Sequence, residues 1–387
     1  MQDILSMKHG LNDKRLVDIC GIQYGCPFDA SLFSTSSYEG MPLIRIRDVK
    51  GGQTETYYSG EYSPEFIIRK GDYLIGMDGE FNIAPWQSED ALLNQRVCKI
   101  YTKSQDVVIK YVYRFLQKEL KKIEDETPFV TVKHLSAKRL NQVYLPVPPI
   151  AEQEKIVAEL DCVSGIIEKK KQQLKELDNL AQSLFYEMFG DPVENDKGWD
   201  VKKIGEVCIV ERGGSPRPIN AFITDDENGV NWIKIGDATE GSRFITSTKE
   251  KIIPEGVRKS RMVYKGDFIL SNSMSFGRPY IMGVDGCIHD GWLVLRDKDN
   301  VFDKTYLYYY LGSSYVYQEF KRLAVGGVVN NLNSELVRGV RVAIPALNIQ
   351  QDFASKIESI EKQKGLIAQS IKETETLFNS RMDYYFN

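Results

Sequence analysis

The middle of the chain places apolar residues at the spacing of a coiled coil. Between residues 152 and 191 they recur in steps of three and four, with one step of seven. This seam predicts an amphipathic helix of about 36 residues, roughly 54 Å long at 1.5 Å per residue. Lys170 stands on the seam where an apolar residue is due, and Gly190 and Pro192 predict the helix end. The seam consists of Ile156, Leu160, Val163, Ile167, Leu174, Leu177, Ala181, Leu184 and Met188.

A second, weaker seam runs through residues 352–387 and is interrupted by Lys364, Thr374 and Arg381. One such helix alone would be expected to pack on a domain core, but two of similar length, each after a globular segment, favour a coiled coil. The second globular segment begins within about ten residues of the first helix, a reach of roughly 33 Å at most. The second domain must therefore lie near the far end of the first helix. If the second helix pairs with the first, it starts there and runs back along it. This predicts an antiparallel pair with one globular domain at each end.

The two globular segments repeat each other, which is the strongest signal in the sequence. Their short apolar runs predict strands, and residues 106–124 and 303–323 predict helices. We therefore expect an α+β protein with two repeated mixed α/β domains separated by the antiparallel helices. The matching blocks are 42–53 with 231–242, 69–79 with 264–274, and 132–153 with 329–350. The expected boundaries are 1–151 for domain 1, 152–191 for helix 1, 192–351 for domain 2 and 352–387 for helix 2.

Charge divides along the same boundaries. Residues 1–151 hold 19 basic and 19 acidic side chains, and residues 192–351 hold 21 and 20. The helical segments hold 5 and 9, and 5 and 6, so they carry a charge of −5, against +1 for the two domains together and −4 for the chain. Bulk positive charge cannot bind nucleic acid here, and any such binding must come from local patches. The acidic helices are suited to docking other proteins.

Catalytic and cofactor motifs are missing from the sequence. It contains no P-loop, no [DNS]PP[YF] tetrapeptide, no HExxH and no G-x-S-x-G. The six Cys form no CxxC pair and only three His accompany them, so we expect no metal site, no cofactor and no disulfide. Neither a signal peptide nor an apolar run of about 18 residues occurs, and we expect a cytoplasmic chain without a catalytic role.

Several stretches resemble the specificity subunit of type I restriction–modification enzymes. They are YGCPFDASLF, PLIRIRDVKGG, MDGEFNIAPWQ and LLNQRVCKI in the first half, and ERGGSPRPI and NWIKIGDATEG in the second. The LP-x-PP-x-x-EQ junction at the end of domain 1 is the most specific of them. The resemblance implies two target recognition domains and two spacer helices. It also implies partners: double-stranded DNA with one half-site per domain, two methyltransferase subunits, and restriction subunits.

A recognition domain needs basic side chains for phosphates and polar ones for base edges. Some of the domain 1 candidates also have a structural explanation. Arg47 could form an ion pair with Asp48 or Asp72, and LLNQR could begin a buried strand whose Asn and Gln side chains satisfy backbone groups. The candidates in domain 1 are Arg45, Arg47, Lys50, Asn82, Trp86, Asn94, Gln95 and Arg96.

The second domain offers a different set of polar residues at matching positions, as two domains that recognise different half-sites should. Arg258, Lys259 and Arg261 are suited to phosphate, or else to a solvated loop. The tyrosines of residues 306–317 could stack on bases, but helical spacing favours the core. The remaining candidates are Ser215, Arg217, Lys234, Asn272, Ser273, Ser275 and Arg278. The alternative from another class is a structural coiled-coil adaptor whose globular ends bind proteins, and a further one is an enzyme whose active site is not evident.

Overall fold

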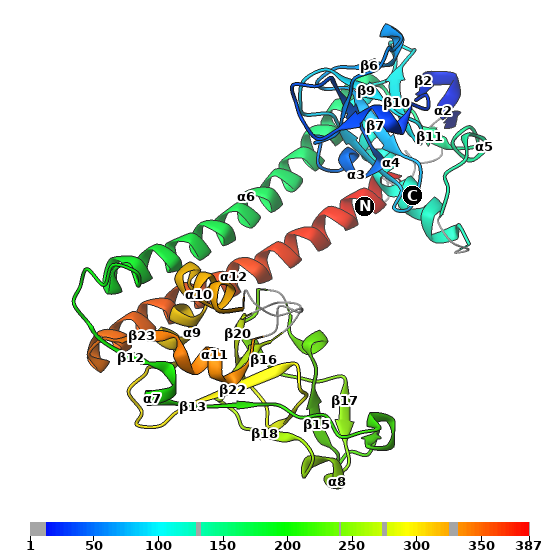
Figure 1. Ribbon diagram of the computed structural model, residues 1–387. Helices are drawn as coiled ribbons and strands as arrows, with labels where there is room; N and C mark the ends of the chain where they lie inside the picture. The colour runs from blue at the N-terminus through cyan, green and yellow to red at the C-terminus, as the bar shows by residue number, and fades with distance from the viewer. Residues whose placement is uncertain (1–12, 129–132, 240, 273–276, 325–331, 387) are drawn as a thin grey trace. The chain divides into compact units, whose positions relative to one another are not determined.

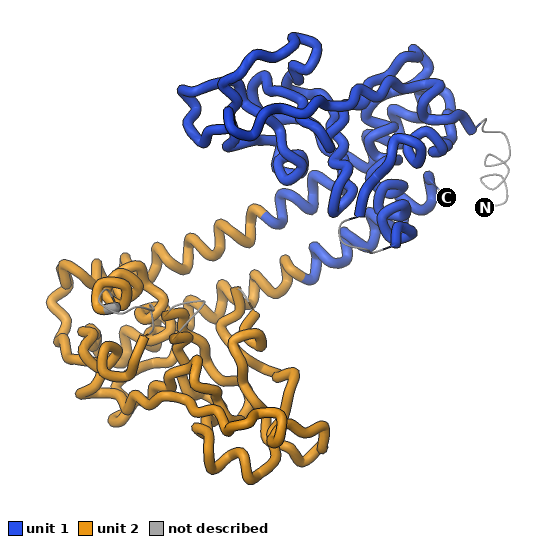
Figure 2. Tube along the Cα trace, turned by 45° about the vertical axis from the view of Figure 1, so that its right-hand side comes forward, with its two compact units in different colours: residues 1–171, 369–387 blue, residues 172–368 orange. Residues whose placement is uncertain are grey.

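The computed structural model describes residues 13–128, 133–239, 241–272, 277–324 and 332–386. The chain divides into two compact units (Figure 2). Unit 1 comprises residues 1–171 and 369–387, and unit 2 comprises residues 172–368. Both long helices, α6 (Ile150–Phe189) and α12 (Leu347–Phe386), contribute to both units (Figure 1). Within the described residues, no helix is long and apolar enough to cross a membrane.

The described residues of unit 1 form three sheets and four shorter α-helices. The four-stranded sheet has the order β2-β10-β7-β8, the five-stranded sheet β3-β5-β4-β9-β6, and β1 pairs with β11. The strands are β1 (Asp13–Arg15), β2 (Cys20–Tyr24), β3 (Phe33–Ser34), β4 (Met41–Ile44), β5 (Tyr57–Tyr58), β6 (Ile67–Ile68), β7 (Tyr73–Gly76), β8 (Asn82–Pro85), β9 (Ala91–Leu93), β10 (Val97–Thr102) and β11 (Tyr144–Pro146). The helices are α2 (Leu16–Ile19), α3 (Ile46–Val49), α4 (Ile109–Glu126) and α5 (Ala137–Leu140), with 3-10 turns η2 (Ala30–Leu32) and η3 (Pro64–Phe66).

Unit 2 repeats this organisation. Its sheets have the orders β13-β22-β19-β20-β16 and β14-β17-β15-β21-β18, and β12 pairs with β23. The strands are β12 (Asp200–Lys203), β13 (Cys208–Arg212), β14 (Ile223–Thr224), β15 (Val230–Ile233), β16 (Phe244–Ile245), β17 (Glu250–Ile252), β18 (Arg261–Val263), β19 (Phe268–Ser271), β20 (Pro279–Met282), β21 (Gly286–Ile288), β22 (Trp292–Asp297) and β23 (Arg341–Ile344). The helices are α7 (Ile204–Val207), α8 (Pro254–Val257), α9 (Lys304–Leu311), α10 (Ser314–Ala324) and α11 (Ser334–Gly339), with η4 (Ile219–Ala221) and η5 (Ile235–Asp237).

The sequence repeat is confirmed by matching hydrogen bonds. Asp72 accepts the backbone N–H of Arg69 at 2.8 Å, and Asp267 accepts that of Tyr264 at 3.0 Å. Each carboxylate also binds one cation of the neighbouring strand, Lys99 in unit 1 at 2.8 Å and Arg296 in unit 2 at 2.8 Å. The KGD blocks therefore build the same turn in both units. Each turn contains a glycine in the left-handed region, Gly71 with φ 93° and Gly266 with φ 94°.

The blocks with LIRIRD and WIKIGD each form a strand followed by a helical turn. Asp48 accepts the backbone N–H of Arg45, and Asp237 accepts that of Lys234, both at 2.8 Å. An acidic residue at this position of a helical turn satisfies a backbone donor that the turn leaves without a partner. The strand predicted from LIRI therefore ends at Ile44, and the residues after it coil.

A buried glutamine fixes the start of each long helix. Gln153 is fully buried; its Oε1 accepts the Val108 N–H at 2.9 Å, and its amide donates to the carbonyls of Asp106 and Pro148. Gln350 makes the equivalent set of bonds in unit 2. The EQ of the junction motif thus links the helix to the segment before α4.

Within each unit the long helices run antiparallel, as predicted. In unit 1, Lys170 donates to the hydroxyls of Ser370 at 2.7 Å and Thr374 at 2.9 Å. In unit 2, Lys364 pairs with Asp178 at 2.7 Å. Lys170 and Thr374, each polar on its own seam, therefore contact each other. These two polar residues interrupt the apolar seams in the sequence, but in the structure they bind each other.

Each unit has its own core. In unit 1 it gathers Tyr111, Phe115 and Leu116 of α4 with Leu160 of α6 and Met382 of α12. In unit 2 the tyrosine-rich segment supplies Tyr306 and Tyr310, which are 0% and 2% exposed and both pack on Phe185. The preference for a core role over base stacking holds for these two tyrosines.

Candidate nucleic-acid interface

Three loops meet at corresponding places in the two units. In unit 1 they are the segment after β2, the β7–β8 loop and the β9–β10 loop. In unit 2 they are the segment after β13, the start of the β19–β20 loop at Asn272, and the β21–β22 loop. In each unit a backbone hydrogen bond joins the first segment to the strand that follows the third loop. The Gly25 N–H donates to the Val97 carbonyl at 3.0 Å, and the Gly213 N–H donates to the Trp292 carbonyl at 2.9 Å. We call these the loop sites of units 1 and 2.

A fourth segment closes each loop site. The N–H of Leu135, before α5, donates to the Met77 carbonyl at 2.7 Å. The N–H of Leu332, before α11, donates to the Asn272 carbonyl at 3.1 Å. The matched blocks 132–153 and 329–350 therefore position the loops as well as starting the long helices.

The loop site of unit 1 contains a contact between an acid, a histidine and an arginine. Asp78 Oδ1 lies 2.5 Å from His134 Nδ1, and Asp78 Oδ2 lies 3.6 Å from Arg96 Nε. Nη1 of Arg96 lies 3.4 Å from Nδ1 of His134. Arg96 has φ 70°, so its backbone adopts the left-handed conformation, and its side chain is 52% exposed. The arrangement presents a cation at the surface with a carboxylate behind it.

Other candidates of the β8–β10 region serve the scaffold or flank the site. Trp86 is 1% exposed, its indole N–H donates to the Glu89 carbonyl at 2.6 Å, and its ring belongs to the core, so no face of it is open to a base. Asn94 is 8% exposed and its side-chain oxygen accepts the Gln95 N–H at 2.8 Å, whereas the Gln95 side chain is exposed, so the alternative with buried amides describes Asn94 and not Gln95. Asn82 donates to the Glu80 carbonyl at 2.9 Å, and its Oδ1 is buried without a hydrogen-bond partner among the described residues.

The basic candidates of α3 are exposed and carry ion pairs. Arg47 Nε lies 3.7 Å from Asp48, one of the two partners considered for it, and Lys50 lies 3.0 Å from Glu80. Arg45 is exposed and precedes the turn. Surface pairs of this kind contribute little to stability, so these side chains are free to exchange partners for phosphate.

In unit 2, Asp290 of the β21–β22 loop contacts residues of the two other loops. Its Oδ1 accepts the Ser215 hydroxyl at 2.7 Å, and its Oδ2 lies 3.7 Å from Arg217 Nη2. Its carbonyl accepts the Asn272 amide at 2.7 Å and Arg212 Nε at 3.0 Å. The hydrogen bond from Ser215 holds the pKa of Asp290 below its ordinary value, so the carboxylate is charged at neutral pH.

The predicted DNA-contact residues of unit 2 differ in their position relative to Asp290. Ser215, Arg217 and Asn272 come together at Asp290, but Asn272 is 3% exposed and acts as a scaffold for the loop. Ser273 and Ser275 lie outside the described residues. Arg278 is exposed at the end of the same loop, where its backbone N–H donates to Ser271 at 3.2 Å.

The remaining basic candidates lie on other elements. Lys234 pairs with Glu250 beside η5, and Arg261 lies 3.1 Å from Glu211. Lys259 lies 4.8 Å from the ring centroid of Phe222. Arg258 is exposed at the end of α8. Of this group, Arg258 and Lys259 are the most open to solvent, which suits phosphate contacts.

Sequence reasoning missed Asp78, Asp290 and His134, which organise the two loop sites. Carboxylates repel the phosphates of DNA, so composition gives no reason to place acidic residues on a DNA-binding surface. Asp290 lies in the β21–β22 loop, which corresponds in the fold to the β9–β10 loop that contains Asn94–Arg96. Within the described ranges, no three His, Cys, Asp or Glu side chains come close enough together to hold a metal ion.

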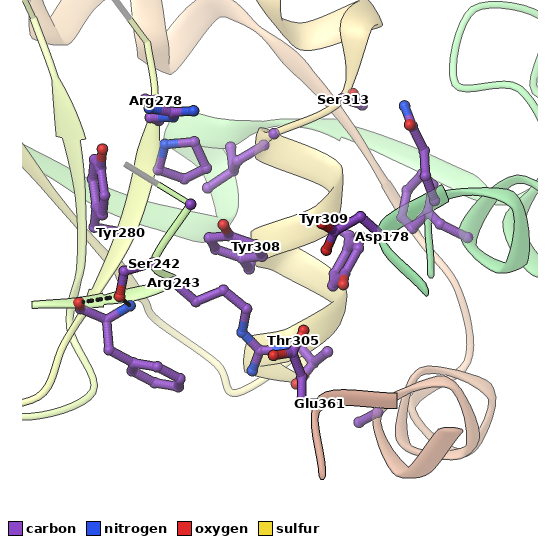
Figure 3. A pocket seen from close by; sticks show the side chains of 18 of the residues that line it. Asp178, Ser242, Arg243, Arg278, Tyr280, Thr305, Tyr308, Tyr309, Ser313 and Glu361 are labelled. Carbon is purple, nitrogen blue, oxygen red and sulfur yellow. Dashed lines mark hydrogen bonds between the residues drawn. The ribbon is translucent and has the colours of Figure 1, made fainter. Parts of the chain in front are cut away.

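Unit 2 also carries a groove of about 1740 Å³ beside α9 (Figure 3). Arg243 lies in it between the rings of Phe244 and Tyr308, with ring centroids at 5.3 and 5.4 Å. Burial raises the pKa of Tyr308 and Tyr309, so both phenols are neutral.

The chain matches a known family over both halves. Residues 9–179 and 196–376 each match the family described as the type I restriction modification DNA specificity domain. The EcoBI type I restriction enzyme specificity subunit of Escherichia coli is 28% identical over 382 residues, covering 89% of this chain and 79% of that protein. The MjaVIII specificity subunit of Methanocaldococcus jannaschii is 22% identical over 322 residues, covering 77% and 74%.

Solved structures show the same fold. A chain from a structure of the assembly of the type I R-M system has a TM-score of 0.58, with 18% identity and 97% of each chain covered. The S subunit of a type I restriction-modification system from M. genitalium has a TM-score of 0.53, with 13% identity, covering 98% of this chain and 97% of that one.

Proposed function

We propose, on the premise that this chain belongs to the type I restriction modification DNA specificity family, that it is the sequence-specificity subunit of such a complex. It binds a bipartite double-stranded DNA target, with one half-site for each recognition domain. The domains are residues 1–151 and 192–351, and the spacer helices are residues 152–191 and 352–387.

The observation that carries this proposal is the pair of loop sites. The same turns and backbone bonds support them, yet the polar side chains differ: the exposed Gln95 and Arg96 in unit 1, and the half-buried Ser215 with the exposed Arg217 in unit 2. A duplicated scaffold with different polar side chains is the arrangement expected for two half-sites of different sequence. Exposed basic residues around each site, such as Arg47 and Arg258, supply phosphate contacts.

Chemistry and motor activity belong to the partners in this proposal. The chain itself is non-catalytic and needs no cofactor; it docks two methyltransferase subunits and the restriction subunits. The repeat supports two methyltransferase copies, because each unit presents an equivalent surface. The exposed face of the acidic helices suits protein docking better than DNA binding.

The test is binding and methylation by the chain with its co-expressed methyltransferase. A library of random duplexes is incubated with the complex, and methylated sequences are recovered and read. We expect a motif of two short half-sites at fixed spacing. Exchange of residues 1–151 for another recognition domain should change one half-site only.

Two outcomes would contradict the proposal. Equal binding and methylation of every sequence by the assembled complex would support the alternative of a structural adaptor. Methylation by this chain alone with S-adenosylmethionine would show that the chain is catalytic.

A further inference from the structure

We propose that Asp78 and Asp290 are positioning residues, each of which holds one exposed arginine, Arg96 or Arg217, for contact with a guanine of its half-site. This inference rests on the proposed function, and it names which side chains give each domain part of its base preference. It also assigns a role to two carboxylates at a surface that must approach an anionic polymer.

In unit 2 the two oxygens of the Asp290 carboxylate have different neighbours. Oδ1 accepts the Ser215 hydroxyl at 2.7 Å and lies 3.5 Å from His289 Nδ1, and these two neighbours restrict the orientation of the group. Oδ2 then faces Arg217 Nη2 at 3.7 Å. The Arg217 side chain is 82% exposed and that of Asp290 is 43% exposed, so the arginine stands in front of the acid.

In unit 1 the same arrangement is built from other loops. His134, from the segment before α5, contacts Asp78 Oδ1, and Oδ2 lies 3.6 Å from Arg96 Nε. The Arg96 side chain is 52% exposed and that of Asp78 is 23% exposed. The acid comes from the β7–β8 loop here and from the β21–β22 loop in unit 2. Two different connections produce one result, an exposed arginine with a fixed carboxylate behind it.

Other arginines in the molecule show what a structural ion pair looks like. Arg114 is 8% exposed in its side chain and lies 2.6 Å from Asp161. Arg296 donates from Nε and Nη2 to Asp267 at 2.9 and 2.8 Å. Both use their donors within the fold. At 3.6 and 3.7 Å, the contacts of Arg96 and Arg217 with their carboxylates are longer than hydrogen bonds. Arg96 Nη1 also lies 3.4 Å from His134, so the donors open to a ligand are the other N–H groups of Arg96 and those of Arg217.

Guanine is the base that fits such a group. It presents two acceptors, O6 and N7, in the major groove, and the planar guanidinium binds both at once. A carboxylate that limits the arginine to a few rotamers reduces the entropy lost on binding. The same carboxylate repels the phosphates and other base acceptors when its arginine is removed, which increases the effect of the substitution.

The test uses the complete methyltransferase complex and the library of random duplexes described above. Arg217→Ala should abolish the preference for one G·C pair in one half-site, a loss of about 5- to 150-fold in discrimination. Arg217→Lys should not restore it, because an ammonium cannot bind O6 and N7 together. Asp290→Asn should weaken the preference at that same pair, and Arg96→Ala and Asp78→Asn should act on the other half-site only.

Arg258→Ala is the matched control, an exposed arginine of unit 2 without a carboxylate partner among the described residues. It should weaken binding to all sequences alike. Retained preference at the untouched half-site shows that each variant complex is folded. If Arg217→Ala weakened all sequences alike, or altered an A·T pair, or if Asp290→Asn left the preference unchanged, the inference would be wrong. A wild-type complex without any motif would refute the proposed function itself, which separates the two failures.

Discussion

Replacing Gln153 tests whether the buried glutamine at the junction determines how the long helix joins unit 1. Gln153→Ala removes three hydrogen bonds, to the Val108 N–H and to the carbonyls of Asp106 and Pro148, at 2.9, 2.8 and 2.7 Å. Each buried backbone group that loses its partner costs about 1–3 kcal/mol. Because Asp106 is exposed, water can replace one bond, and we expect a loss of about 3 kcal/mol in the free energy of unfolding of unit 1.

Two further variants separate hydrogen bonding from packing. Gln153→Glu keeps the size of the side chain but places an oxygen against the two carbonyl acceptors, so we expect a loss at least as large as that of Gln153→Ala. Glu154→Ala, at the exposed neighbouring position, should change the free energy by less than about 0.5 kcal/mol.

The assay is urea unfolding of the full chain together with hydrogen exchange of the peptide that contains Val108. Faster exchange at Val108 should accompany the loss of stability, because its N–H loses the Gln153 oxygen. A Gln153→Ala variant within about 1 kcal/mol of the Glu154→Ala control would refute the reasoning. So would a stable Gln153→Glu variant, since that result would assign the position to packing alone.

Three further predictions concern other contacts. Lys170→Ala should lower the free energy of unfolding by about 1–2 kcal/mol in urea, because two hydroxyls of α12 lose their donor; an unchanged midpoint would show that the contact is dispensable. Arg114→Ala should cost about 2–4 kcal/mol in the same assay, since it leaves Asp161 without its closest cation, and an Asp161→Asn, Arg114→Ala double variant should lose less than the sum. Burial lowers the pKa of His289, so the folded state resists protonation; stability should be constant above about pH 6.5 and fall as the pH drops below it, and His289→Gln should remove that fall in melting temperatures measured from pH 7.5 to 5. An identical acid dependence in the variant would assign the fall to other groups.

Much of the scaffold was accessible from the sequence because it depends on local patterns. The KGD blocks form equal turns since both need a glycine at positive φ followed by a capping aspartate, and the two residue types are adjacent in the chain. The seams of α6 and α12 likewise predict long helices that run antiparallel. The strand predicted from LIRI ends early because Asp48 caps a helical turn, a bond that the apolar pattern does not reveal.

The loop residues were harder to rank, and Trp86 shows why. From the sequence it lies in the stretch GEFNIAPW, just before polar residues, and was a candidate for DNA contact. Its backbone N–H donates to Asp72 at 2.7 Å, as that of Met282 donates to Asp267 at 2.8 Å, so both are core positions of the repeat. Burial depends on which strand lies opposite, and that information is not local.

By itself, the sequence determined the duplication, the two long helices, the near neutrality of the two domains and the polar composition of the loops. These follow from periodicity, short motifs and charge, which act over a few residues. Only the tertiary structure decided that Asp290 meets Ser215 and Arg217, residues more than seventy positions away, and that Asp78 meets His134 and Arg96. Such contacts arise where sheet pairing brings distant loops together, so the side chains that face a ligand are set by the fold and not by their neighbours in the chain.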